Sequence, residues 1–390
     1  MLDRSPVRTA FHFVLLIGIL SFFADFAYEG SRSTLGPYLG SLGVTAAAIG
    51  VITGLGELLG YGLRLLSGRL ADASRQYWPI TIFGYVVQMS SVPALALAHS
   101  WPAAAALIIL ERIGKGIRNP PRDAMLSHAG KHIGGYGWAF GLHEGLDQLG
   151  ALSGPLIIAF VLAHRGTYAR AFGILLVPAV ITLALVVTAR LLYPRPQDLE
   201  TESQAVRSQE LPRVYWIYLA GAALVAAGFA DYPLIAYHFT HRHVLAVDQV
   251  PIFYAVAMAV SGAGSLVFGR LFDRFGFSVL IALTVLSMLF APLMFLGGFW
   301  VALVGAAVWG LGMGVHETII PAAVAPMVAP ERRASAFGLF TAGYGAAWFL
   351  GSAAIGLLYD RSVYAAVGFC VVAELAAVPL FATVRRRLAR

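Results

Sequence analysis

Long apolar segments follow one another along the whole chain, separated by short polar loops. A helix that crosses a bilayer needs about 20 predominantly apolar residues. In the first half such segments run roughly over 11–38, 45–67, 79–98, 101–120, 136–162 and 169–192. In the second half they run roughly over 214–239, 248–269, 277–297, 299–325, 334–358 and 363–384. The pattern predicts an all-α, polytopic membrane protein with 12 transmembrane helices. The first segment continues into polar sequence without a convincing small-residue cleavage site, which favours a retained helix over a signal peptide.

The longest polar stretch of the chain lies between the two sets of six segments. It covers 193–213 and shows no apolar periodicity, as is typical of a linker. We therefore expect three parts: an N-terminal six-helix bundle over 1–192, a cytoplasmic linker over 193–213, and a C-terminal six-helix bundle over 214–390.

Composition supports the membrane interpretation. Hydrophobic residues make up 59% of the chain and charged residues 12%, against about 25% charged residues in soluble globular proteins. So few charges argue against a soluble enzyme, a secreted disulfide-framed domain or a disordered chain. The single cysteine, Cys370, excludes an internal disulfide and a cysteine-based zinc site.

The net charge of +7 is explained by basic residues in loops on one side of the membrane. With the N-terminus placed inside, the inner segments hold Arg4, Arg8, Arg69, Arg75, Arg118, Arg122, Lys131, Arg190, Arg195, Arg207, Arg213, Arg270, Arg274, Arg332, Arg333, Arg385, Arg386, Arg387 and Arg390. The outer loops hold only Arg165, Arg170, Arg242 and Arg361. This bias predicts that both termini are cytoplasmic. Because this bias accounts for the net positive charge, the charge does not indicate a nucleic-acid partner.

The two halves carry matching short sequences in the same order. Phe23-Ala24-Asp25 recurs as Phe229-Ala230-Asp231. Gly68-Arg69-Leu70-Ala71-Asp72 recurs as Gly269-Arg270-Leu271-Phe272-Asp273, and Ala139-Phe140-Gly141-Leu142 recurs as Ala336-Phe337-Gly338-Leu339. Two parallel six-helix repeats with a site between them near the midplane are typical of secondary transporters.

These motifs resemble those of the major facilitator superfamily. The loop sequences GRLADASRQYW and GRLFDRFG resemble its cytoplasmic loop signature, and Arg112-Ile113-Gly114-Lys115-Gly116 resembles its span-4 arginine signature. Gly150-Ala151-Leu152-Ser153-Gly154-Pro155 matches an element of the family's antiporters. The stretch RIGKGIRNPPRDA, with AFGLHEGLDQLGALSGPL after it, resembles a bacterial subgroup. The resemblance implies a bacterial cytoplasmic (inner) membrane location and a cavity lined by spans 1, 4, 7 and 10, with help from spans 2 and 5.

Two groups of motif residues are expected to serve conformational change. Arg69, Asp72, Arg270 and Asp273 lie at cytoplasmic helix ends and can form a latch between the bundles, or they can be ordinary solvated loop charges. Gly150, Gly154 and Pro155 allow close helix approach and a local bend, or only generic small-residue packing.

Ionisable residues inside the apolar segments are the candidate site residues, because a charge near the bilayer centre is costly and needs a partner or a role. We expect the following to handle substrate or protons: Asp25, Glu29, Glu57, Glu111, Arg112, Lys115, His143, Glu144, Asp147, Asp231, His316 and Glu317. The alternative for each is an ion pair that locks helices together, for example Glu111 with Arg112 or Arg64. Glu374 of span 12 has no explanation in this scheme.

The two halves differ at the positions of these charges. Phe340 stands at the position of His143 in the second half, and Tyr344 at that of Asp147. We therefore expect His143, Glu144 and Asp147 to form part of a proton-coupling site. The sequence has no phosphate-binding loop of the Walker type, so ATP is not the expected energy source.

The leading hypothesis is a monomeric, proton-coupled antiporter that exports a small cationic or zwitterionic solute by alternating access. Its expected partners are the solute, protons and the lipid bilayer, without a cofactor and without nucleic acid. One alternative is a divalent-metal exporter with His143, Asp147, His316 and Glu317 as ligands. Two others are an integral-membrane enzyme that uses the His143–Glu144–Asp147 cluster as acid and base, and a receptor that transports nothing.

Overall fold

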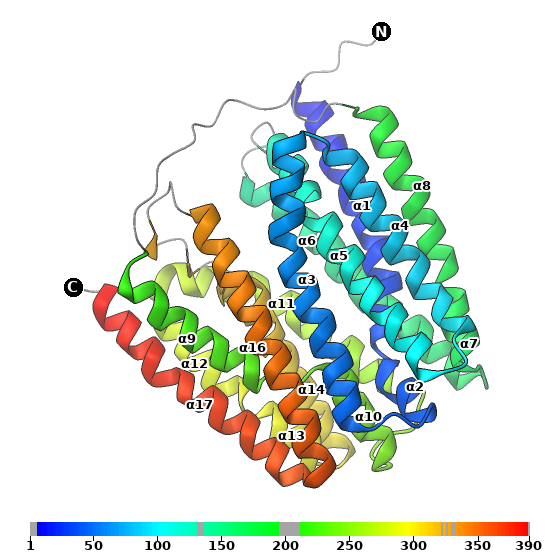
Figure 1. Ribbon diagram of the computed structural model, residues 1–390, viewed down its shortest axis with the longest axis vertical. Helices are drawn as coiled ribbons and strands as arrows, with labels where there is room; N and C mark the ends of the chain where they lie inside the picture. The colour runs from blue at the N-terminus through cyan, green and yellow to red at the C-terminus, as the bar shows by residue number, and fades with distance from the viewer. Residues whose placement is uncertain are drawn as a thin grey trace. The chain divides into compact units, whose positions relative to one another are not determined.

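The computed structural model describes residues 6–130, 136–194, 211–320, 323–324, 327–328 and 333–388. Within these ranges the regular structure is helical (Figure 1). The expectation of an all-α, polytopic membrane protein is confirmed.

The described residues of the first half form eight α-helices, and in two places a pair of consecutive helices makes up one predicted span. Their bounds are α1 Pro6–Arg32, α2 Leu35–Ser41, α3 Ala46–Ser74, α4 Tyr77–Ala94, α5 Trp101–Gly130, α6 Tyr136–Ala163, α7 Tyr168–Ile174 and α8 Leu176–Leu192. The short 3₁₀ turn η1, Leu95–Leu97, extends α4.

The second half repeats this arrangement. Its α-helices are α9 Arg213–Gly228, α10 Tyr232–His241, α11 Val250–Phe275, α12 Phe277–Ser287, α13 Phe290–Leu296, α14 Phe299–Gly314, α16 Arg333–Arg361 and α17 Val363–Leu388. A π-helical turn, η3 Val315–Ile319, continues α14.

Breaks divide the first span of each half. The predicted span 11–38 is interrupted at residues 33–34, and the span 214–239 is interrupted over residues 229–231. Eleven described segments have the length and hydropathy of a membrane span. The helix α5 is not one of these eleven, because its acidic and basic residues lower its hydropathy.

The chain divides into two compact units. Unit 1 consists of Met1–Arg32 and Leu59–Ser203, and unit 2 of Ser33–Leu58 and Gln204–Arg390. The segment Ser33–Leu58, which the sequence assigns to the N-terminal bundle, therefore has most of its contacts in unit 2. It comprises α2 and the first part of α3.

Unit 1 is held together by two pairs of closely packed helices. In Figure 1, α1 lies along α6, and α4 lies along α5. A Cβ atom added at Gly154 of α6 would overlap the carbonyl oxygen of Phe26 in α1, and one at Gly150 would overlap that of Phe22. Glycine is the residue that permits this approach. The predicted packing glycines thus lie in the α1–α6 contact, and their part in conformational change stays a prediction.

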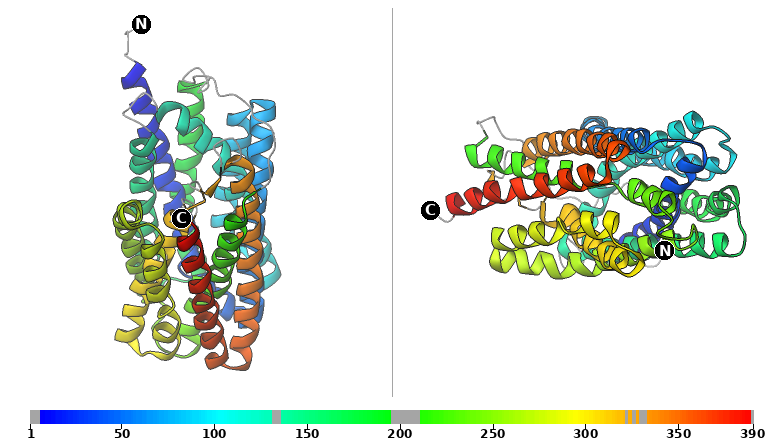
Figure 2. Two further views of the ribbon diagram at one scale, coloured as in Figure 1. Left: turned by 90° about the vertical axis from the view of Figure 1, so that its left-hand side faces the viewer. Right: turned by 90° about the horizontal axis from the view of Figure 1, so that it is seen from below.

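In unit 2, too, helices pack closely at a glycine that lies against a backbone carbonyl of the neighbouring helix. The helices α9, α16 and α17 lie side by side (Figures 1 and 2), and α11 packs on α14. A Cβ added at Gly351 of α16 would overlap the carbonyl oxygen of Ala227 in α9. At the end of α16, the Asp360 carboxylate accepts hydrogen bonds from the backbone N–H groups of Ala46 at 3.2 Å and Ala47 at 2.9 Å, which caps α3.

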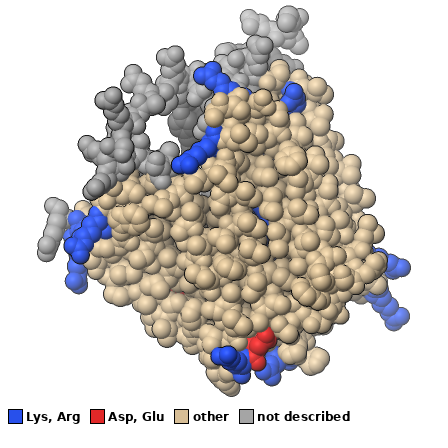
Figure 3. Space-filling view, in the orientation of Figure 1, with Lys and Arg blue, Asp and Glu red and all other residues tan. Residues whose placement is uncertain are grey.

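The surface fits a lipid environment. Large apolar side chains are exposed, among them Leu66, Phe83, Phe160, Val177 and Leu350. On the face drawn in Figure 3, charged side chains are sparse and most of the visible surface belongs to other residue types. The charged groups of the apolar helices are instead found inside each unit.

Candidate functional site

The centre of the site in unit 1 is a row of four cations on α5. Arg112, Lys115, Arg118 and Arg122 follow one another at spacings of three, three and four residues, which place them on one side of a helix. Arg118 is 0% exposed, and Arg112 and Arg122 are buried as well. The sequence counted Arg118 and Arg122 among the basic residues of the inner segments; in the structure both lie within α5, which extends ten residues beyond the predicted span end at 120.

Arg118 is surrounded by polar groups of α1 and α4. Its Nε donates to Gln88 Oε1 at 2.6 Å and its Nη1 to the Tyr85 hydroxyl at 3.0 Å. Its Nη2 lies 3.5 Å from Asp25 Oδ1. The helices can approach because Gly114 has no side chain: a Cβ there would lie 2.6 Å from the backbone nitrogen of Gln88. Gly114 of the span-4 motif therefore allows α4 to bring Gln88 and Tyr85 to Arg118.

Arg122 connects α5 to α1 and α6. It pairs with Asp123 Oδ1 at 2.8 Å and donates to Ser21 Oγ of α1 at 3.2 Å. Ser21 Oγ in turn shares a hydrogen bond of 2.8 Å with His143 Nε2. A continuous polar path thus runs from α5 through α1 to the buried histidine of α6.

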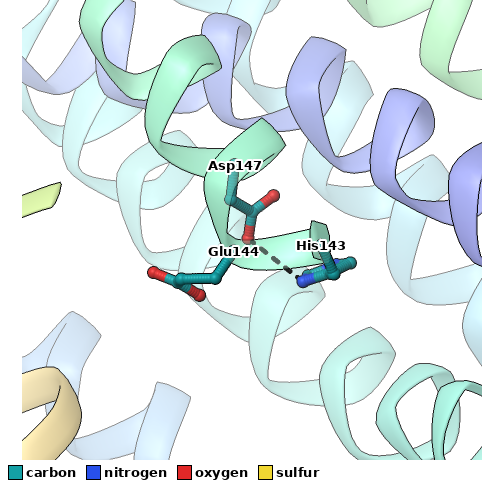
Figure 4. A group of neighbouring side chains, drawn as sticks. All are labelled: His143, Glu144 and Asp147. Atoms are coloured by element: carbon teal, nitrogen blue, oxygen red, sulfur yellow. Dashed lines mark ion pairs between the residues drawn. The ribbon is translucent and has the colours of Figure 1, made fainter. Parts of the chain in front are cut away.

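His143, Glu144 and Asp147 form a compact group on α6 (Figure 4). One ligand atom from each lies within 4.8 Å of the others, and His143 Nδ1 is 4.0 Å from Asp147 Oδ2. Glu144 Oε1 accepts a hydrogen bond of 2.9 Å from Gln148 Nε2. The Asp147 carboxylate also interacts electrostatically with cations of the α5 row, namely Lys115, Arg118 and Arg122.

A second group in unit 1 surrounds Tyr28 of α1. Arg112 Cζ lies 5.0 Å from the centre of its ring, Lys115 Nζ 3.8 Å and Arg32 Cζ 6.0 Å. Glu111 lies 3.6 Å from Arg112 and accepts a hydrogen bond of 2.9 Å from Gln88. The Glu111–Arg112 pair that the sequence raised as an alternative is therefore present in this structure. Glu29 is buried on the same helix as Tyr28.

In unit 2, Asp231 is buried at the break between α9 and α10. It accepts hydrogen bonds from Trp348 Nε1 at 3.1 Å and Ser352 Oγ at 2.9 Å. Asp25 and Asp231 occupy matching sequence positions in different surroundings: a guanidinium lies near Asp25, whereas an indole and a hydroxyl donate hydrogen bonds to Asp231.

His316 of η3 lies in an aromatic cluster of the same unit. Its ring is 4.3 Å from that of Phe229 and 5.1 Å from that of Trp348, and Nδ1 hydrogen-bonds the Tyr344 hydroxyl. A π-helical turn inside an α-helical run is often found at functional sites. Glu317, the neighbouring candidate, is exposed, whereas His316 is buried.

The remaining predicted residues are more widely spread. Glu57 is buried in unit 2, and Glu374 is 0% exposed on α17 beside Gly228 of α9. Arg69 and Arg270 are exposed, and the side chains of Asp72 and Asp273 lie outside the described residues. Arg118 and Arg122 were absent from the predicted site, although their helical spacing after Arg112 and Lys115 was a readable signal.

Comparison with known proteins agrees with this architecture. The model of the family described as Major Facilitator Superfamily matches residues 17–314 and 217–389. An uncharacterized protein of Mycobacterium tuberculosis is 41% identical over 97% of this chain and 94% of its own length. An uncharacterized MFS-type transporter of Methanocaldococcus jannaschii is 26% identical over 67% of each chain. A multidrug resistance protein of Cronobacter sakazakii is 27% identical over 42% of this chain and 40% of its own.

Solved structures share the fold. A nucleoside transporter has a TM-score of 0.73 with 14% identity, covering 96% of this chain and 98% of that one. A peptide transporter in complex with sulfate has a TM-score of 0.75 with 15% identity, covering 96% and 94%. Identities this low show the fold alone. Together with the family model they identify a multi-pass membrane transporter and not an enzyme. The chain belongs to the major facilitator superfamily.

Proposed function

We propose that this protein is a proton-coupled secondary transporter that exports a small zwitterionic solute across the cytoplasmic membrane. The observation that carries the proposal is the α6 group, in which Asp147 lies beside His143 and Glu144 and interacts with three cations of α5. A carboxylate in such a place is suited to exchange a proton between two conformations.

The proton step follows from two opposed influences on Asp147. Burial favours the neutral carboxyl, whereas Lys115, Arg118 and Arg122 favour the carboxylate. A small change in the distance between α6 and α5 alters this balance. Alternating access would supply that change, so that the carboxyl takes up a proton in one conformation and releases it in the other.

The substrate proposal is narrower than the sequence hypothesis. The acidic residues alone favoured a cationic solute, but Asp25 faces Arg118, and Glu111 faces Arg112. The polar interior of unit 1 therefore offers both signs of charge. A zwitterion can interact with both the carboxylates and the guanidinium groups, whereas a simple cation can interact favourably only with the carboxylates.

Export is supported by two likenesses. The element Gly150-Ala151-Leu152-Ser153-Gly154-Pro155 matches one found in the family's antiporters, and one relative carries the name of a multidrug resistance protein. The excess of basic residues in alternate loops supports cytoplasmic termini in a bacterial inner membrane. We also propose that the transporter is a monomer. We further propose that it belongs to a bacterial subgroup marked by the motif RIGKGIRNPPRDA.

The proposed latch of Arg69, Asp72, Arg270 and Asp273 acts on the conformational equilibrium. The two copies of the motif support it. Asp72→Asn should reduce the transport rate while leaving substrate affinity within about threefold, because the site itself is unchanged. Equal losses of binding and transport would contradict the latch.

Flux measurements with the purified protein in proteoliposomes test the function. The panel holds neutral amino acids and dipeptides as zwitterions, quaternary ammonium ions as cations, and monocarboxylates as anions. We expect accumulation of zwitterions against their gradient only when a pH gradient is imposed. Flux unaffected by the gradient would contradict proton coupling, and preference for quaternary ammonium ions would contradict the substrate class.

A divalent-metal exporter is the second candidate, and the α6 group favours it. His143, Glu144 and Asp147 bring their ligand atoms within 4.8 Å of one another. Imidazole and carboxylate ligands suit Zn²⁺ or Mn²⁺, but the nearby guanidinium of Arg122 repels a cation. Uptake of Zn²⁺ or Mn²⁺ into proteoliposomes, lost in His143→Gln, would favour this candidate over the first.

A further inference from the structure

Glu374 of α17 is a buried carboxyl group that has no part in the proposed function. It is 0% exposed in unit 2, and neither of its side-chain oxygens has a hydrogen-bond partner among the described residues. We propose that Glu374 is a second proton-binding site, at which a resident proton keeps the carboxyl neutral and allows α17 to pack against the end of α9. The inference goes beyond the proposed function, which places its proton on Asp147 in unit 1.

The carboxyl lies beside the last turn of α9, where the first span of unit 2 is interrupted. The helix α17 lies along α9 (Figures 1 and 2). A Cβ atom added at Gly228 would lie 3.1 Å from Glu374 Cγ. Gly228 is the last residue of α9, and Phe229 after it is extended, with φ −87° and ψ 110°. Glu374 therefore packs at the point where α9 ends.

The groups that act on the Glu374 carboxyl within the described part of the chain are uncharged. They are the Ser287 hydroxyl at the end of α12 and the Cys370 thiol, one turn earlier on α17. Ser287 Oγ is buried close to the carboxyl but outside hydrogen-bond geometry. From α9 the contact is made by Gly228, which has no side chain.

The charged residues of the helices packed around Glu374 lie elsewhere. The charge of α9, Arg213, is at the opposite end of that helix, and α12 and α13 carry no acidic or basic residue. In α16, Asp360 and Arg361 are exposed. The arginines of α17, 385–387, lie about three turns further along the helix. Glu374 is therefore a buried acid without a cation to compensate for its charge in the described ranges.

An ionised carboxylate at this position is unfavourable for two reasons. Burial of a charge without a partner is so costly that such a group takes up a proton instead. The end of α9 raises this cost, because the C-terminal end of a helix carries partial negative charge. A bound proton removes both penalties, and it is therefore what allows Glu374 to be buried there.

The neutral carboxyl also has an O–H donor that the carboxylate lacks. The last four carbonyl groups of a helix have no partner within that helix. At this break one carbonyl oxygen, that of Ala230, accepts a hydrogen bond of 2.9 Å from Trp309 Nε1. The O–H of Glu374 is suited to serve a carbonyl group at the end of α9. Deprotonation would replace this donor by a negative charge, so it should weaken the contact between α9 and α17.

This proton differs from the one proposed at Asp147. Three cations of α5 act on Asp147 and oppose the effect of its burial, so a small displacement changes the balance. No cation opposes the burial of Glu374 in the described residues, so the carboxyl keeps its proton through small displacements. The expected consequence is a stability that falls as pH rises, because the folded state holds a proton that the unfolded state releases.

Infrared difference spectroscopy of the full-length protein in nanodiscs tests the site directly. A neutral carboxyl has a carbonyl stretching band that a carboxylate lacks. We expect this band in the spectrum of wild type minus Glu374→Gln at pH 7. Wild type minus Asp360→Asn is the control and should lack it, because Asp360 is exposed. Absence of the band from the first difference would overturn the inference. So would its loss in sodium chloride but not in choline chloride, because a sodium ion would then occupy the carboxylate.

The pH dependence of unfolding in a detergent titration gives a second measurement. Between about pH 6 and 8 the unfolding equilibrium constant should rise with pH more steeply in the wild type than in Glu374→Gln, by up to about tenfold per pH unit for one proton. Glu374→Leu also lacks the titratable group and should match the glutamine variant, so it serves if that variant folds poorly. Equal slopes in the wild type and both variants would contradict a resident proton.

Cys370 allows a third measurement that needs no substitution. It is the single cysteine of the chain and is buried one turn from Glu374, so its S–H stretching band is a local probe of the charge there. We expect this band to keep its position between about pH 5 and 7. A shift in that range would show that Glu374 is ionised at pH 7 and would overturn the inference. None of the three measurements uses transport, so failure of pH-driven flux would overturn the proposed function alone.

Discussion

The two units build their interiors from matching helices but with different chemistry. In unit 1, Asp25 faces the guanidinium of Arg118, and α6 carries His143 and Asp147. In unit 2, Asp231 accepts hydrogen bonds from an indole and a hydroxyl, and the positions of the α6 pair hold Phe340 and Tyr344. Repeats that keep the fold can therefore diverge in the groups they bury.

The difference indicates a division of roles. The charges of unit 1 depend on protonation state and on distance, so they respond to a change of conformation. The aromatic cluster of unit 2, with Phe229, His316 and Trp348 in ring contact, has no such dependence on a row of cations. We infer that unit 1 handles the proton and the ionic groups of the solute.

The strongest test of this division is Asp147→Asn. We expect loss of pH-driven accumulation in proteoliposomes, by about a hundredfold or more, because the amide cannot exchange a proton. Exchange of labelled for unlabelled solute should continue, since it needs no net proton movement. Tyr344→Phe, at the matching position of unit 2, is the control and should keep accumulation within a few-fold. Normal accumulation in Asp147→Asn would show that the carboxylate is a structural ion-pair partner.

The second test compares the two matching aspartates. Asp25→Asn removes the carboxylate near a fully buried guanidinium, which costs about 3 kcal/mol in comparable buried pairs. Asp231→Asn keeps an oxygen that accepts from Trp348, so about 1 kcal/mol is expected. The free energy of unfolding in a detergent titration measures both. Equal losses would mean that Arg118 is satisfied by Gln88 and Tyr85 alone.

The sequence was sufficient for the architecture because the apolar segments are long and their periodicity is unambiguous. It also indicated the α6 group, since His143 and Asp147 are one turn apart. It counted Arg118 and Arg122 only among the basic residues of the inner segments and not among the site residues, and it ended the span at 120, whereas α5 continues through Pro120 and Pro121 to Gly130.

The Tyr28 group was beyond sequence reasoning for a different reason. The span assignment showed Arg32, Arg112 and Lys115 as separate charges on two helices, and nothing local states that they meet at one ring. Only the packing of α1 against α5 reveals it. Likewise, the affiliation of Ser33–Leu58 with unit 2 depends on tertiary contacts and not on chain order.

A third test asks where the two units should behave alike. Gly154 and Gly351 both face a carbonyl oxygen of the neighbouring helix, Phe26 in one unit and Ala227 in the other. Alanine at either position should lower the free energy of unfolding by about 2 kcal/mol, because the helices must separate. Gly145→Ala and Gly368→Ala are the matched controls, since a Cβ there meets nothing within 4 Å. A large effect at one glycine only would show that the two contacts are not equivalent.

The smallest expected effect concerns a contact that unit 1 lacks at the matching position. Asp360 lies at the end of α16, where α6 has Ala163, and its exposed carboxylate caps α3 through Ala46 and Ala47. Removing a cap of this kind typically costs about 1 kcal/mol, so Asp360→Ala should lower the midpoint of unfolding slightly. Hydrogen exchange should show the larger change locally, as faster exchange in the first turn of α3, because these N–H groups lose their acceptor.

Asp360→Asn keeps two side-chain polar atoms but loses the charge that favours a helix N-terminus, and its exchange rates should fall between those of the wild type and the alanine variant. Unchanged exchange in Asp360→Ala would mean that Thr45, whose Oγ1 accepts from Ala48 N at 3.3 Å, caps the helix sufficiently by itself.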